Sequence, residues 1–127
     1  MFNQTTQIRR GEIYYCDLGD GFGSEQGGMR PCVVLQNDIG NRHSPTTLIA
    51  PLTSRKAHKK LPTHIFVNKN NCRIRQDSVI LLEQIRTVDR NRLRNYVTYL
   101  DDFKMCEVNN AVMVSFGLAE PERRTTE

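Results

Sequence analysis

Short runs in which apolar and polar residues alternate occupy most of the chain as far as residue 100, and this period of two predicts strands. The runs are rich in β-branched and aromatic residues and end at Gly, Asn, Asp or Pro. Strands are expected at residues 12–18, 32–36, 46–52, 63–67, 78–88 and 96–100. Residues 78–82 form the most apolar run, which predicts a strand covered on both faces.

The spacing of apolar residues changes to that of a helix after residue 100. Asp101 or Asp102 is expected to cap this helix, which runs to Gly117 and has two neighbouring apolar stripes. Such a wide apolar face predicts contact with more than one surface, a barrel and a second subunit. Residues 119–127 are polar and include Pro121, so a disordered tail is expected there.

Glycine and polar clusters separate the predicted strands. We expect a long loop at 19–31, a turn at 37–41, a basic loop at 55–60 and one turn of helix at 89–93. Many short strands followed by one helix favour a small antiparallel β-barrel with a C-terminal helix. Since no linker or repeat divides the chain, we interpret residues 1–118 as one domain.

The composition adds limits on function and location. The 127 residues have a formal net charge of +4, which permits nucleic-acid binding without requiring it. The four cysteines, at 16, 32, 72 and 106, form no C-x-x-C pair, so we expect reduced thiols and no zinc or other metal site. No run is apolar enough for a signal sequence or a membrane span, and a cytoplasmic protein is expected.

The glycine-rich stretch at 23–31, Gly-Ser-Glu-Gln-Gly-Gly-Met-Arg-Pro, contains the first candidate for chemistry. Glycines let the backbone pass close to a ligand, while Pro31 favours an extended conformation at Arg30. A flexible loop that ends in an arginine at the mouth of a strand can present a guanidinium to a phosphate. The alternative is an ordinary hairpin loop with a solvated arginine.

Four cations within 55–60 form the second candidate. If this loop faces the same way as Arg30, then Arg55 and Lys56, together with Arg86, would line a groove for the phosphates of single-stranded RNA. A solvated loop is the alternative interpretation.

Six motifs follow one another in a distinctive order. They are Arg-Gly-Glu-Ile-Tyr at 10–14, the glycine-rich stretch at 23–31, Gln-Asn-Asp at 36–38, Ser-Pro-Thr at 44–46, Leu-Pro-Thr-His at 61–64 and Asp-Ser-Val-Ile-Leu-Leu-Glu-Gln-Ile-Arg-Thr at 77–87. With them, residues 10–118 strongly resemble the MazF/PemK family of toxins from type II toxin–antitoxin modules.

This resemblance implies an SH3-like β-barrel assembled as a homodimer. It also implies a sequence-specific, metal-independent endoribonuclease that needs no cofactor, cuts single-stranded mRNA and stops growth until an antitoxin restrains it. The acidic C-terminal segment of the antitoxin would fold onto the toxin. The cleavage sequence implied is a short, ACA-containing site flanked by uracil.

The family's functional residues match particular positions of this chain. Its catalytic arginine falls on Arg30, and its catalytic threonine, at a strand end, falls on Thr53. The flexible loop that contacts RNA matches Ser24, Glu25, Gln26, Gly27 and Gly28, and a polar residue of the floor of the site matches Gln84. The tail after Leu118 matches nothing in the family.

These residue types suit cleavage in which the 2′-hydroxyl attacks its own phosphate and leaves a 2′,3′-cyclic phosphate and a 5′-hydroxyl. Arg30 would stabilise the charge on phosphorus, and Thr53 would donate one further hydrogen bond. The proton carrier stays open, because no spacing joins the three histidines, His43, His58 and His64. Glu25 is a candidate accessory base, against the alternative of a solvated carboxylate.

Two other functions fit the same small barrel. A toxin of this fold can poison gyrase by binding it, and small barrels also act as plain binding modules. A glycine-rich loop with an arginine, followed by a threonine at a strand end, favours the ribonuclease.

Overall fold

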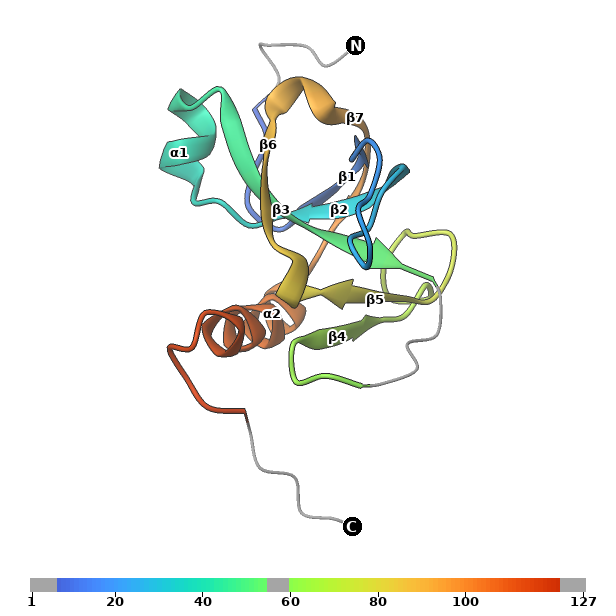
Figure 1. Cartoon of the computed structure of the whole chain (residues 1–127), viewed down its shortest axis with the longest axis vertical. Helices are drawn as coiled ribbons and strands as arrows, with labels where there is room; N and C mark the ends of the chain where they lie inside the picture. The colour runs from blue at the N-terminus through green and yellow to red at the C-terminus, as the bar shows by residue number, and fades with distance from the viewer. Residues whose placement is uncertain (1–6, 55–59, 122–127) are drawn as a thin grey trace.

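A computed structural model describes residues 7–54 and 60–121. The described chain is mainly β with a C-terminal helix, as predicted (Figure 1). The strands are β1 (Glu12–Asp17), β2 (Met29–Val34), β3 (Thr46–Thr53), β4 (His64–Val67), β5 (Ser78–Leu81), β6 (Arg86–Asp89) and β7 (Leu93–Tyr99). The helices are α1 (Asp38–His43) and α2 (Asp102–Ser115), and the two short 3-10 helices are η1 (Leu82–Gln84) and η2 (Arg90–Arg92).

All strands belong to one antiparallel sheet, in the order β4-β5-β3-β2-β1-β7, and β6 pairs with β3 beside this path. The long strand β3 is the centre of the sheet, since different parts of it pair with β2, β5 and β6. The two ends of the order, β4 and β7, each pair with one neighbour in the described residues. The sheet described is therefore open rather than a closed barrel.

Both faces of the central strands are buried. Alternate residues of β1 and β2 enter two different clusters, with Ile13 and Val33 in the cluster that α2 covers and Tyr14 and Cys32 in the other. Burial on both sides explains why these strands have few polar positions.

The helix α2 begins where the sequence predicts. The carboxylate of Asp101 accepts a hydrogen bond from the backbone N–H of Lys104 at 2.8 Å, as an N-cap does. Val108 and Ala111 pack on the core, whereas Phe116 on the second apolar stripe is exposed. Each of the two predicted stripes is therefore covered only in part among the described residues, since Val108 shares its stripe with Phe116, and Ala111 shares the other with the exposed Leu118.

Four predicted boundaries are wrong, and one of them is the strand expected at 96–100, which is β7 and already starts at Leu93. The turn at 37–41 is the short helix α1, because the side chain of Asn37 caps it by accepting from the N–H of Gly40 at 2.7 Å. The strand at 78–88 is interrupted by η1. The strand predicted at 32–36 is β2, which starts earlier, so Arg30 lies inside a strand rather than before one.

Two sets of predictions cannot be compared with the structure. The basic loop, with Arg55, Lys56 and His58, lies outside the described residues apart from Lys60, and so does most of the predicted tail.

Candidate active site

The loop between β1 and β2 is closed at its base by backbone hydrogen bonds. The N–H of Leu18 donates to the carbonyl of Gly28 at 2.9 Å, and the N–H of Gly28 donates to the carbonyl of Gly19 at 2.7 Å. Gly28 has φ +79°, and a Cβ on Gly27 would lie 2.5 Å from the backbone nitrogen of Gly21. Glycine is required at both positions, once for conformation and once for space.

Gln84 fixes the far side of this loop to the sheet. Its side-chain oxygen accepts from the N–H of Gln26 at 2.9 Å, and its side-chain nitrogen donates to the carbonyl of Ser24 at 3.3 Å. The 3-10 turn η1 breaks the strand at this point and thereby presents the amide to the loop. Gln84, which the resemblance to the family assigns to the floor of the site, thus lies beside the glycine-rich loop.

Arg30 is half-buried and held by two carbonyl groups. Its Nε donates to Gly27 at 3.0 Å and its Nη1 donates to Leu52 at 3.4 Å. A guanidinium has five N–H donors, and contacts with the described residues 7–54 and 60–121 use two of them, which leaves three that no described residue occupies. The arginine is therefore oriented before any substrate arrives, and it retains donors on one edge.

Thr53 is the last residue of β3 and follows Leu52, whose carbonyl holds Arg30. Its backbone is paired with Val79 of β5. The structure thus brings the two predicted catalytic residues to one place, although the segments that contain them are more than 20 residues apart in sequence.

The other predicted RNA-binding residues are distributed around the loop. Arg86, at the start of β6, donates from Nη1 to the carbonyl of Leu18 at 3.3 Å, so it supports the base of the loop. Glu25 is exposed and accepts from the N–H of Phe22 at 3.1 Å, which shapes the tip.

A histidine–glutamate pair beside η1 is a feature that the sequence interpretation missed. His64 Nε2 lies 3.0 Å from Glu83 Oε2, and the other oxygen of Glu83 accepts from the hydroxyl of Thr63 at 2.9 Å. Since the N–H of Leu61 donates to His64 Nδ1 at 3.3 Å, the neutral imidazole donates from Nε2 to the carboxylate. Only the pairing of strands brings the two residues together, because His64 on β4 is opposite Leu81 on β5, immediately before η1.

Two buried thiols lie under the arginine. Cys32 Sγ contacts the carbonyl oxygen of Arg30 at 3.5 Å, and Cys16 is the strand partner of Arg30. A hydrogen bond to Cys16 and burial raise the pKa of Cys32, so it stays a neutral thiol. The same hydrogen bond lowers the pKa of Cys16, but both thiols are fully buried and belong to one packed cluster.

Two properties of the described chain bear on its function class. Among residues 7–54 and 60–121, no group of three or more His, Cys, Asp and Glu side chains is placed to hold a metal ion. No described helix has the length and hydrophobicity that crossing a membrane requires.

Comparisons with known proteins agree with this geometry. The model of PemK-like, MazF-like toxins of type II toxin–antitoxin systems matches residues 9–116. A relative from Staphylococcus saprophyticus named Endoribonuclease MazF is 54% identical over 111 residues, which is 87% of this chain and 92% of the relative.

Solved structures show the same fold at lower identity. MazF from Deinococcus radiodurans superposes with a TM-score of 0.75 at 23% identity, covering 88% of this chain and 98% of that one. A mycobacterial endoribonuclease solved in complex with its cognate antitoxin superposes with a TM-score of 0.72 at 24% identity, covering 90% and 99%. On the family model and the identity to the staphylococcal protein, the chain belongs to the PemK-like, MazF-like toxins of type II toxin–antitoxin systems.

Proposed function

We propose that this chain is the toxin of a type II toxin–antitoxin module and that it inhibits growth by cutting single-stranded mRNA as a metal-independent endoribonuclease. The principal support is Arg30, which two backbone carbonyls orient beside Thr53 in a chain 54% identical to an endoribonuclease. Neither a gyrase-binding toxin nor a plain binding module requires an arginine fixed in this way.

In the proposed reaction the 2′-hydroxyl of a nucleotide attacks the adjacent phosphorus, and the 5′-oxygen of the next nucleotide leaves. The products are a 2′,3′-cyclic phosphate, which can open to a 3′-phosphate, and a 5′-hydroxyl. The remaining N–H groups of Arg30 would stabilise the negative charge that develops on the phosphoryl oxygens, and Thr53 would add a hydrogen bond. With a pKa above about 12, arginine is a poor proton carrier, so its role here is electrostatic.

The β1–β2 loop would read the RNA sequence. Ser24, Glu25 and Gln26 offer donors and acceptors for the edges of unstacked bases, while the close-packed glycines let RNA approach the backbone. Gln84 would position the loop and form the floor of the site, and Arg55, Lys56 and Arg86 would attract phosphates. An ACA-containing sequence flanked by uracil is the proposed target.

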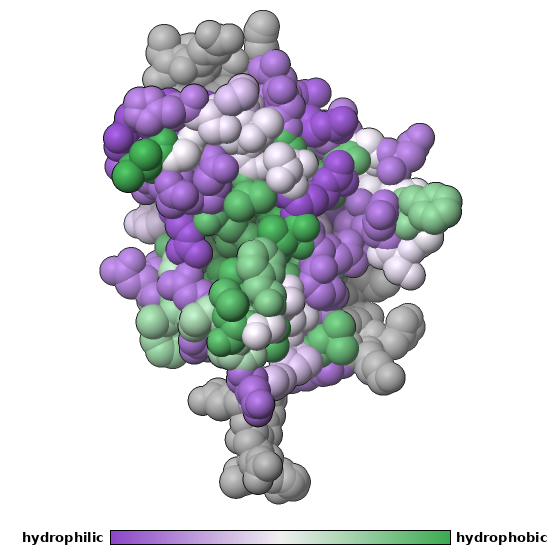
Figure 2. Space-filling view, turned by 60° about the vertical axis from the view of Figure 1, so that its left-hand side comes forward, coloured by the Kyte–Doolittle hydropathy of each residue, from purple (hydrophilic) through white to green (hydrophobic). Residues whose placement is uncertain are grey.

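A homodimer is proposed on the basis of an exposed apolar area. Figure 2 shows hydrophobic side chains gathered in the middle of the face where β6 and α2 lie, surrounded by polar ones. Met113, Phe116 and Leu118, in and just after α2, are exposed hydrophobic residues. A second copy of the chain would cover them. Sedimentation of a Phe116→Asp variant as monomer, against a dimeric native protein, would support this assembly, and unchanged dimers would contradict it.

Residues 1–118 form one toxin domain with an SH3-like barrel, and 119–127 form a tail; the branching of β3 to three partner strands supports this curvature. The protein acts in the cytoplasm. The antitoxin is a partner whose acidic C-terminal segment binds the basic groove.

Incubation of the purified protein with a long RNA in EDTA tests the activity. Cleavage at a few sites that share bases, with 5′-hydroxyl ends that need phosphorylation before ligation, is the expected result. Intact RNA together with gyrase inhibition would overturn the proposal in favour of the gyrase-binding toxin. Intact RNA without gyrase inhibition would favour a binding module.

A further inference from the structure

A basic and aromatic surface lies on a different side of the molecule from the apolar area. Two adjoining cavities, of about 360 and 440 Å³, share Asn71, Cys72, Tyr99 and Asp101 in their walls. They are bordered by the turn between β4 and β5, the end of β7 and the start of α2. We call them together the β4–β5 hollow.

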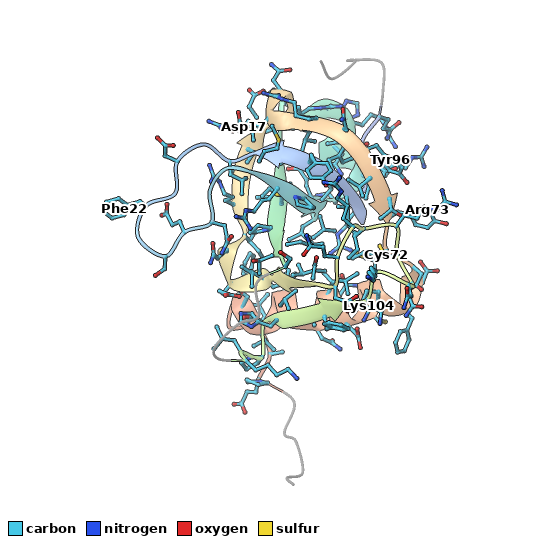
Figure 3. All side chains as sticks on the ribbon, turned by 90° about the vertical axis from the view of Figure 1, so that its right-hand side faces the viewer. Asp17, Phe22, Cys72, Arg73, Tyr96 and Lys104 are labelled. Carbon is cyan, nitrogen blue, oxygen red and sulfur yellow. The ribbon has the colours of Figure 1, made fainter. Side chains whose placement is uncertain are left out.

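Exposed aromatic side chains surround the β4–β5 hollow. Phe66 on β4, Tyr99 on β7 and Phe103 on α2 are 52%, 64% and 74% exposed, and all three line it. Tyr96 on β7 is exposed as well, and Figure 3 shows its side chain near Arg73 and Cys72. In the described part of the chain, the other exposed aromatics are Phe22 at the tip of the β1–β2 loop and Phe116 in the apolar area. The proposed function uses Phe116 and leaves the aromatics of the hollow without a role.

Some charged side chains of the hollow are bonded to other described residues, and others are not. Lys104 donates to the carbonyl of Phe66 at 2.9 Å and pairs with Glu107 at 2.8 Å, and Asp101 caps α2. By contrast, the side chains of Lys69 and Arg73 make no hydrogen bond or ion pair with any of residues 7–54 and 60–121, although both line the hollow. Two cations are therefore available to an anionic ligand.

Paired residues of three neighbouring strands connect the candidate active site with the hollow. Thr53 on β3 pairs with Val79 on β5, and Val79 pairs with Phe66 on β4. Directly paired residues have their side chains on the same face, so all three lie on one face in a row. With neighbouring strands about 4.8 Å apart, Thr53 and Phe66 are separated by about 10 Å. A chain that passes Thr53 reaches the hollow within a few nucleotides.

We propose that the β4–β5 hollow is an auxiliary binding site for the single-stranded RNA that flanks the cleavage site. Lys69 and Arg73 bind phosphates, while Tyr99 and Phe103 stack on bases without regard to sequence. The exposed amides of Asn70 and Asn71 can donate to and accept from base edges. This inference rests on the proposed function for the identity of the ligand. Aromatic faces beside unpaired cations favour RNA over an acidic peptide, which has no bases to stack.

Direct binding separates this site from catalysis. In a cleavage-impaired Arg30→Ala background, Arg73→Ala and Tyr99→Leu should each lower the affinity for a long RNA about tenfold. A short RNA that contains only the cleavage sequence should bind these double variants as tightly as it binds the Arg30→Ala protein. Arg73→Ala should also lower the salt slope of long-RNA binding by about 1. Tyr99→Phe retains the aromatic face and should retain the affinity.

Arg42→Ala is the matched control, since Arg42 is an exposed cation on α1. It should leave long-RNA affinity close to that of the background protein. Equal long-RNA affinities for Arg73→Ala, Tyr99→Leu and Arg42→Ala would overturn the proposal. If Arg73→Ala instead weakens polyglutamate and not RNA, the hollow binds acidic peptides and the proposal is also overturned.

The other two cysteines, Cys72 and Cys106, allow RNA binding in the hollow to be tested without changing any of its side chains. Cys72 lines the hollow and burial raises its pKa, whereas Cys106 is exposed on α2. In the Arg30→Ala protein, an RNA oligonucleotide should slow alkylation of Cys72 severalfold at alkaline pH and leave Cys106 unaffected. Equal protection of both thiols, or of neither, would contradict binding in the hollow. Native protein that fails to cut RNA while Cys72 is protected would overturn the proposed function and not the hollow.

Discussion

Two arginines of this chain lie in opposite settings. Arg30 is half-buried and two carbonyls fix its guanidinium, whereas Arg73 is exposed and its side chain bonds to no described residue. A group that stabilises a transition state must be in place before the charge develops, because reorganisation would cost part of the gain. A group that attracts phosphates needs only its charge and its reach. The difference in setting therefore indicates a difference in task.

The largest expected effect is at the fixed arginine. Arg30→Ala should lower the cleavage rate by about 10²–10³-fold, which is the loss typical of one donor to a developing oxyanion. The unfolding free energy should change by only about 1 kcal/mol, because two modest hydrogen bonds are lost from a half-buried site. Single-turnover cleavage and urea titration measure the two quantities. A folded Arg30→Ala protein that cuts at a near-native rate would remove Arg30 from the active site.

The same conservative change at both arginines sharpens the comparison. Arg30→Lys keeps the charge but loses the fork and the Nε bond to Gly27, so cleavage should fall by roughly 30-fold or more. Arg73→Lys keeps all that a phosphate contact requires and should change long-RNA affinity by less than about twofold. If both variants lose function equally, the distinction between a fixed and an unpaired arginine fails.

The loop that positions Arg30 should matter less than the arginine itself. Gln84→Ala removes two hydrogen bonds to the loop, each contributing about 0.5–1.5 kcal/mol, and should lower kcat/KM about tenfold. Amide exchange at Gln26 should become faster at the same time. Gln84→Glu keeps the acceptor for Gln26 and should lie between native and Gln84→Ala. Slow exchange in Gln84→Ala would show that other contacts hold the loop.

The smallest expected effect is at the hollow. Asp101→Asn removes a negative charge from its wall but keeps an N-cap side chain on α2. Long RNA should bind about two- to threefold more tightly, with unchanged stability. Asp101→Ala is the control, since it removes the same charge and should also cost α2 about 1 kcal/mol. Weaker RNA binding by Asp101→Asn would mean that the carboxylate contacts the ligand.

The active-site half of this comparison could be predicted from the sequence. Arg30 stands out in the glycine-rich loop, whereas Thr53 and Gln84 are singled out only by the resemblance to the family, and the structure brings these segments together. The sequence does not reveal the hydrogen-bond partners of these residues. The two carbonyls that hold Arg30 belong to Gly27 and Leu52, and only the fold decides which backbone groups are free to accept from it. The mechanism assigned to these residues stays a proposal.

The errors in the fold have local physical causes. The residues at 37–41 have turn composition, but the Asn37 cap and burial of Asn41 favour a helical turn. The apolar run at 78–88 looks continuous because a 3-10 turn at Leu82 still points that side chain into the core. The His64–Glu83 pair and the β4–β5 hollow join residues from separate strands and loops, so no local pattern announces them.

The pairing of the first strand with the last has a consequence for the order of synthesis and folding. Residues of β1 pair with residues of β7, and the N–H of Leu100 donates to the carbonyl of Gly11 at 2.9 Å. Contacts of such long sequence separation form late and slow the folding of small β proteins. The strand next to Arg30 therefore has its second neighbour only when nearly the whole chain has left the ribosome. We therefore expect the nascent chain to be inactive until β7 has emerged, and arrested chains that end before residue 93 should show no RNA cleavage.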